Sequence, residues 1–166
     1  MTREDAYYLK HLLLSDFREV YEEELNGFLE AEEPISDITL KLAFLGSDTE
    51  KAIYELGCYC SEEPFDEDAA CHKLRLFLKK AYHSHEMTKD EVVHTMYRFA
   101  LQHEDIFSTD SDVWHSMYIL HDYYDLAEIG VIGFRCFDQG FLDFLNDGIL
   151  VSDEKMTAGV WSRRIL

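Results

Sequence analysis

His121 is followed directly by Asp122, the one His-Asp pair in the sequence. Imidazole and carboxylate groups together can hold a divalent metal ion, which would activate a water molecule for hydrolysis. A complete site needs further ligands, and those available are one carboxylate downstream, Asp143, and three histidines upstream, His83, His85 and His94. Because a chain with 34 acidic residues forms such pairs by chance, we favour the simpler interpretation that both are ordinary helix residues.

The pair resembles the His-Asp pair of the all-helical HD-type metal-dependent phosphohydrolases, and the resemblance is confined to His121 and Asp122. It implies a metal-assisted phosphohydrolase, which we keep as an alternative function. The sequence contains no glycine-rich phosphate loop, no Gly-x-Ser-x-Gly turn and no His-Glu-x-x-His helix. We therefore assign no catalytic residue and no cofactor, and we expect a protein that is not an enzyme.

Four side chains carry the donor atoms that zinc prefers: Cys58, Cys60, Cys71 and His72. Their spacing argues against a zinc site, because Cys58 and Cys60 would point to different sides of a helix. The remaining cysteine is Cys136. The four cysteines of the chain show no spacing typical of a small disulfide scaffold. We expect reduced thiols and no metal, which favours a cytoplasmic protein.

The chain is strongly acidic, since 34 Asp and Glu against 15 Lys and Arg give a net charge of −19. Its hydrophobic fraction of 47% indicates a folded body that carries this charge on its surface. Residues 1–68 hold 19 acidic against 5 basic residues, a net charge of −14. The electric field of this negative charge repels nucleic acid and anionic lipid and attracts basic proteins towards the chain. We expect a basic protein partner, no direct nucleic-acid contact and no membrane contact.

Acidic residues gather in two clusters of the N-terminal half. The first lies near the end of an expected helix, where the helix dipole disfavours negative charge, and continues into a linker: Glu19, Glu22, Glu23, Glu24, Glu30, Glu32 and Glu33. The second surrounds a turn that lies near the first if the helices pack as hairpins: Glu62, Glu63, Asp66, Glu67 and Asp68. Either the clusters form a solvated face that maintains solubility, or they form an electrostatic docking surface.

Two adjacent tyrosines, Tyr123 and Tyr124, are flanked by Asp122 and Asp125. Tyrosine combines a large contact area with a hydroxyl group that forms hydrogen bonds, as binding hot spots require. We predict a partner-binding segment here. The competing interpretation places the two rings in the core or at half-buried helix positions.

This segment resembles the Asp-x-Tyr-Tyr-Pro motif of the colicin DNase immunity proteins, which are acidic helical proteins that bind and neutralise a basic nuclease. The chain lacks the residue between aspartate and tyrosine and has Asp125 in place of the proline. The resemblance implies a mechanism in which Tyr123 and Tyr124 anchor the partner. The acidic residues that would select that partner are Glu22, Glu23, Glu24, Glu62, Glu63, Glu67 and Asp68.

Apolar residues at helical spacing predict a mostly all-α fold. The first helix is expected over residues 2–26. A short helix capped by Ser36 follows and ends at Gly46, and the capping-box spacing of Ser47 and Glu50 predicts another.

Three longer helices are expected next, over residues 66–82, from the Thr88 and Glu91 capping box to about residue 103, and over residues 111–128. The first of these carries four cations, for which we expect pairing within the helix or with neighbouring helices: Lys73, Arg75, Lys79 and Lys80.

Beyond residue 130 the pattern is mixed. Residues 131–137 are compatible with a strand, while we favour a last helix over residues 137–145. Residues 149–166 are expected to form a short strand or an ordered coil, with Trp161 docked on the body. We expect a single domain, built either as a helix bundle or as a short stack of antiparallel helix hairpins.

The N-terminal residues are charged where a signal peptide needs an apolar core, and no apolar run approaches the roughly 18–20 residues that cross a bilayer. Our leading hypothesis is a cytoplasmic bacterial immunity or inhibitor protein, an antitoxin that occludes a basic toxin, most plausibly a nuclease. Besides the phosphohydrolase, a second alternative is a nucleic-acid mimic that blocks a DNA-binding protein. The partner's identity, the toxin's activity and the oligomeric state stay open.

Overall fold

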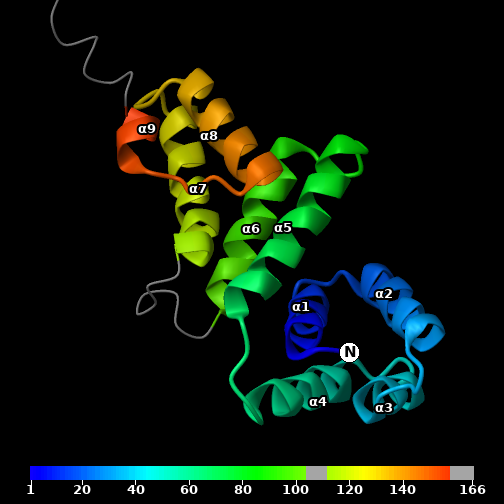
Figure 1. The fold of residues 1–166 in the computed structure, drawn as a ribbon. Helices are drawn as coiled ribbons and strands as arrows, with labels where there is room; N and C mark the ends of the chain where they lie inside the picture. Colours follow the sequence, from blue (N-terminus) through cyan, green and yellow to red (C-terminus); the bar gives the residue numbers. More distant parts are fainter. Residues whose placement is uncertain (104–111, 158–166) are drawn as a thin grey trace, which may run out of the picture. The chain divides into compact units, whose positions relative to one another are not determined.

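A computed structural model describes residues 1–103 and 112–157 of the chain (Figure 1). This part folds into nine helices and contains no strand, so the predicted all-α fold is confirmed: α1 (Arg3–Leu14), α2 (Arg18–Ala31), α3 (Asp37–Leu45), α4 (Thr49–Ser61), α5 (Glu67–His83), α6 (Lys89–Gln102), α7 (Asp112–Glu128), α8 (Phe134–Asp147) and α9 (Asp153–Thr157). The expected docking of Trp161 lies outside the described residues.

The contacts divide the chain into two compact units, Met1–Ala70 and Cys71–Leu166. The boundary falls inside α5, whose first residues belong to the first unit. We describe each unit separately, and the single cooperative domain expected from the length stays a prediction.

The N-terminal unit begins with two helices where the apolar pattern predicted one over residues 2–26. Helix α1 ends at Leu14, and the Ser15 amide donates back to the carbonyl groups of His11 and Leu12. Asp16 then adopts a left-handed conformation with φ of 67°, which redirects the chain before α2 begins at Arg18. The prediction of one continuous helix was wrong because the apolar spacing continues through this turn.

Helix α1 is the centre of the N-terminal unit. It packs against α2 and α4, and α3 packs against the same two helices. The side chains that fill this core are apolar and almost fully buried: Leu9, Leu12, Leu42, Ala52 and Leu56. Burial of such side chains supplies the main stabilising term for these short helices, which would be marginal alone.

Two helix starts in this unit differ from the predicted caps. Ser36 occupies the N-cap position of α3, but its hydroxyl lies 2.8 Å from the Thr39 hydroxyl and caps no backbone group. At α4 the capping box of Ser47 and Glu50 was wrong, because Asp48 is the N-cap residue and accepts from the Lys51 amide at 3.2 Å.

The second unit contains the longer helices, with α7 packed against both α6 and α8. The predicted capping box is confirmed at α6, where the Thr88 hydroxyl accepts from the Glu91 amide and the Glu91 carboxylate accepts from the Thr88 amide. The core contains large, almost fully buried side chains: Leu74, Leu78, Met96, Phe99, Trp114, Phe137, Phe141 and Phe144.

The last helices extend beyond the predicted ranges. Helix α8 starts at Phe134, so the strand considered for residues 131–137 does not form. Gly140 is buried inside α8, and Met156 of α9 packs directly over it. The described part of residues 149–166 contains this short helix α9 where a strand or coil was expected.

Two predicted cations of α5 hold the C-terminal end of α8. Arg75 is buried and donates to the Leu145 carbonyl at 2.7 Å, and Lys79 donates to the Asn146 carbonyl at the same distance. Both cations satisfy carbonyl groups that a helix end leaves unpaired. Pairing with a neighbouring helix, as expected for this cluster, is confirmed for these two residues.

Within the described ranges, none of the helices has the length and apolarity needed to cross a membrane.

Candidate partner-binding surfaces

The exposed face of α2 carries a row of carboxylates. Glu19, Glu23 and Glu30 are exposed, and at 100° per residue they fall within about 40° of one another around the helix. They point away from Tyr21 and Leu25, the buried residues of α2. None of the three has an ion-pair partner among the residues that the structure describes. We call Glu19, Glu23 and Glu30 the α2 stripe.

The other two glutamates predicted for this helix have partners inside the unit. Arg18 donates from Nε to Glu22 at 2.7 Å, and the Tyr8 hydroxyl donates to Glu24 at 3.2 Å. Burial and the Glu23 and Glu24 carboxylates raise the pKa of Tyr8 above its ordinary value. Glu24 therefore fixes α2 to α1, and of the predicted Glu22, Glu23 and Glu24 group only Glu23 belongs to the α2 stripe.

The second acidic cluster is more fully paired. Arg3 of α1 contacts Glu62 at 3.5 Å and Glu63 at 3.1 Å. Asp66 accepts from the Ala69 amide at 3.0 Å, and Glu67 and Asp68 also have interactions with other residues.

Helix α1 contacts both acidic clusters. Arg3 contacts the second cluster from its first turn, while Tyr8, further along the same helix, contacts α2. The Met1 amino group also pairs with Glu32 of the first cluster, so parts of both clusters lie at the N-terminal end of α1.

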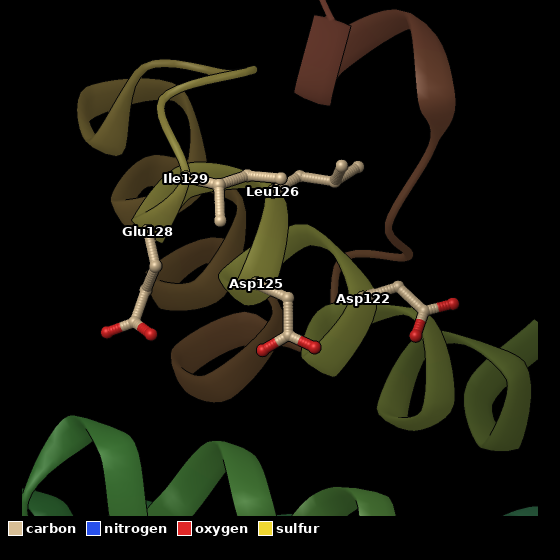
Figure 2. A pocket seen from close by; sticks show the side chains of 5 residues that line it. All are labelled: Asp122, Asp125, Leu126, Glu128 and Ile129. Carbon is tan, nitrogen blue, oxygen red and sulfur yellow. The ribbon is translucent and has the colours of Figure 1, made fainter.

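Carboxylates also gather at the C-terminal end of α7 in the second unit. Asp122, Asp125 and Glu128 line an open depression of about 510 Å³ together with Leu126 and Ile129. Figure 2 shows the three carboxylates on one side of α7. Helix α7 has no basic residue in its last turn, where the dipole favours positive charge. Local helix stability therefore gives no reason for acids at these positions.

The two tyrosines of this segment belong to the core of the unit. Tyr123 and Tyr124 are each 8% exposed, and the Tyr123 hydroxyl donates to Asp153 of α9. Burial and the Asp90 and Glu128 carboxylates raise the pKa of Tyr124 to about 12. The surface that this segment offers to a partner therefore consists of Asp122 and Asp125, which are exposed, and not of the two rings.

Of the histidines considered as metal ligands, His94 and His121 lie together, with ring centroids 5.0 Å apart. The His121 ring stacks on Tyr97 at 4.4 Å, and its Nδ1 lies 3.7 Å from Asp125. His83 is hydrogen-bonded to Asn146, and Asp143 accepts from Gln139. In residues 1–103 and 112–157, no group of three or more His, Cys, Asp or Glu side chains is placed to hold a metal ion.

All four cysteines are free thiols. Burial raises the pKa of Cys60 to about 11, so this thiol stays protonated and unreactive at neutral pH. The other side chains considered and rejected as zinc donors have different contacts: the Cys71 sulfur lies 3.8 Å from the Met117 sulfur, and His72 accepts from Arg75 at 3.4 Å. Buried free thiols were expected, and Cys60 and Cys71 are buried, whereas Cys58 and Cys136 are only half-buried.

No protein-family model matches the chain, and neither a curated protein nor a solved structure matches it. The function proposed below therefore depends on the chemistry of these surfaces.

The structure also exposes two aromatic side chains that the sequence analysis did not single out. Phe44 of α3 is 88% exposed and Tyr54 of α4 is 68% exposed. The exposure of Phe44 could have been predicted from the helical period, because Ile38 and Leu42 form the buried face of α3 and Phe44 falls on the opposite face.

Proposed function

We propose that this chain is an acidic binding protein that neutralises a basic toxin, a nuclease, by occluding the surface with which the toxin holds nucleic acid. The observation that supports this function best is the α2 stripe. Three exposed carboxylates share one helix face and have no ion-pair partner in the described part of the chain.

The stability of α2 does not account for this arrangement. Glu19 and Glu23 are like charges four residues apart, a pair that destabilises a helix by about 0.2–0.5 kcal/mol. Glu30 lies in the last turn, where the dipole is unfavourable for an acid and where α2 carries no basic residue. Glu19 itself lies in the first turn of α2, where the dipole favours an acid, so helix stability accounts for Glu19 but not for Glu23 and Glu30, and the three together suit a basic ligand.

Occlusion follows from the charge of both partners. A nuclease holds its substrate through Lys and Arg side chains that contact phosphates. Carboxylates of the α2 stripe would take the place of those phosphates, while the field of the chain accelerates the encounter. The resemblance to the colicin DNase immunity proteins suggested this mode of action, but the buried Tyr123 and Tyr124 do not serve as its anchors, so the proposal depends on the carboxylates.

The acids at the end of α7 are the second surface that the proposal uses. Asp122 and Asp125, with Glu128 beside them, present carboxylates next to the aliphatic side chain of Ile129, which is 73% exposed. This combination suits a Lys or Arg side chain, whose aliphatic stem packs on apolar groups while its charged end pairs with acids.

A pull-down tests the proposal. The tagged chain is incubated with a lysate of its own source at 50 mM and at 300 mM salt, and bound proteins are identified by mass spectrometry. We expect capture of a basic nuclease, weaker at the higher salt because screening reduces charge pairing. The captured nuclease should lose DNA cleavage when the chain is added in equal amount.

Two variants with the same change in net charge are compared, and the second is the control. Glu19→Lys/Glu23→Lys/Glu30→Lys reverses the α2 stripe, and Glu86→Lys/Asp147→Lys/Glu154→Lys changes the net charge equally at other exposed positions. Loss of capture with the first variant alone supports the proposal. Equal capture by both would show that the acids only maintain solubility.

A further inference from the structure

Helices α3 and α4 present an apolar surface to solvent. Phe44 is 88% exposed, Tyr54 is 68% exposed and Leu40 is 38% exposed. Leu40 and Phe44 are four residues apart in α3, so their side chains are neighbours on one helix face. The N-terminal unit therefore displays two aromatic rings and a leucine outside its core.

Packing of the unit does not use these side chains. The buried residues of α3 are Ile38, Thr39 and Leu42, on the face opposite Phe44. Helix α4 likewise buries Ala52, Leu56 and Cys60 and turns Tyr54 outward. Exposed apolar rings of this size bring no stability to the fold, and grouped apolar side chains on a surface mark interaction sites.

An ion pair joins the two helices at this surface. The Lys41 ammonium contacts the carboxylate of Glu55, the residue that follows Tyr54 in α4. Phe44 lies one turn beyond Lys41 in α3. Lys41 thus connects the exposed side of α3, which carries Phe44, to the exposed side of α4, which carries Tyr54.

The surroundings of the apolar surface are acidic. Both lysines of α3 and α4 are paired, Lys41 with Glu55 and Lys51 with Asp48. Asp37 and Glu50 are exposed on the same two helices. Helix α3 also packs against α2, which carries the α2 stripe. The apolar surface is therefore part of a strongly negative unit whose nearby cations are already neutralised.

We infer that Phe44 and Tyr54, with Leu40, are the apolar anchors through which this chain binds a basic partner protein. The inference rests on the proposed function and names its contact residues. The partner is a protein that displays apolar groups between Lys and Arg side chains. Aromatic anchors surrounded by pairing charges are typical of binding hot spots. A second copy of this chain is a poor occupant, because both copies would bring a net charge of −14 in residues 1–68.

Site-specific photocrosslinking tests the inference. Phe44 or Tyr54 is replaced by the photoreactive amino acid p-benzoylphenylalanine in the full chain, which is irradiated in a lysate of its own source. Leu101 of α6 is 50% exposed and serves as the control position. We expect a crosslink from positions 44 and 54 to one basic protein, identified by mass spectrometry, and none from position 101.

Three results would overturn the inference: a crosslink to a second copy of the chain, equal crosslinking from all three positions, or no crosslink from positions 44 and 54. If positions 44 and 54 give no crosslink but the pull-down captures a basic nuclease, only this inference fails. If neither experiment detects a basic protein, the proposed function fails with it.

Substitution gives an independent measurement on the crosslinked protein. Phe44→Ser and Tyr54→Ser should each weaken its binding at least tenfold in isothermal titration calorimetry, and Leu101→Ser should leave binding unchanged. Because both rings are exposed, the variants should keep the circular dichroism spectrum of the parent. Unchanged binding by both variants contradicts the role assigned to these rings.

Discussion

The Arg75 guanidinium donates from Nη1 to the carbonyl oxygen of Leu145 at 2.7 Å and so closes the C-terminal end of α8. The same nitrogen lies 3.4 Å from the Phe144 carbonyl oxygen. Gly148 ends α8 in a left-handed conformation, with φ of 69°, directly against the guanidinium. This buried cation therefore satisfies the Leu145 carbonyl group and places positive charge at the negative dipole end of α8.

Replacing Arg75 tests this role. Arg75→Met keeps much of the side-chain volume but leaves the Leu145 carbonyl group without its donor, which should cost about 2–3 kcal/mol of unfolding free energy. Urea unfolding followed by circular dichroism measures the loss. Lys80→Ala on the exposed side of α5 should change stability by less than about 0.5 kcal/mol, and equal losses for both would contradict the account.

Gly140 makes room for Met156. A Cβ at position 140 would lie 2.4 Å from the Met156 methyl carbon, and Met156 is 1% exposed. Gly140→Ala should gain up to about 1 kcal/mol in helix propensity but lose about 1–3 kcal/mol from overpacking. We expect net destabilisation, with α9 displaced, measured by thermal unfolding.

A double variant separates the gain in helix propensity from the loss caused by overpacking. In Gly140→Ala/Met156→Ala the clash is absent, so the destabilisation should be smaller than the sum of the single changes. Strict additivity would show that Met156 does not limit the side chain at position 140.

The helices that were correctly predicted share a local signal. The Thr88 and Glu91 spacing predicted a capping box, and α6 begins there, whereas the same spacing at Ser47 and Glu50 forms none because Asp48 is the N-cap residue of α4. The break after Leu14 has no such signal. Leu13, Phe17 and Tyr21 continue the helical spacing across it, and only the left-handed Asp16 interrupts the helix. A polar residue in a left-handed turn is not distinguishable from a helical one by period alone.

For the candidate surfaces, too, the helical period predicted only part of the arrangement. Asp122 and Asp125 are exposed, as a partner-binding role requires, but the burial of Tyr123 and Tyr124 depends on α9 and α6, which lie elsewhere in the sequence. Phe44 differs, because its position opposite the buried face of α3 could have been read from the helical period.

The Tyr123 hydroxyl holds α9 through Asp153. Tyr123→Phe removes this donor and keeps the ring, so the cost should be about 1 kcal/mol. The change should be local. Hydrogen exchange measured by mass spectrometry should accelerate in Asp153–Thr157 and stay unchanged in α6, whereas uniform acceleration would contradict a local role for this bond.

Tyr124 makes stability sensitive to alkaline pH. Its pKa is raised from 10.0 to about 12, first by burial and then by Asp90 and Glu128. The neutral phenol therefore stabilises the folded state fully below pH 10, and this contribution is lost as the pH rises from 10 towards 12. The urea midpoint should fall less steeply over this range in Tyr124→Phe than in the parent; parallel curves would contradict the assignment.

The central claim is that the acids of this chain occupy the nucleic-acid site of a basic nuclease. The most direct measurement is competition, in which a fluorescent DNA duplex bound to the captured nuclease, with its metal ion withheld to prevent cleavage, is titrated with the chain. We predict that the parent displaces the duplex at an equimolar amount and that the variant with the reversed α2 stripe does not. Binding of the chain without displacement of the duplex would contradict occlusion.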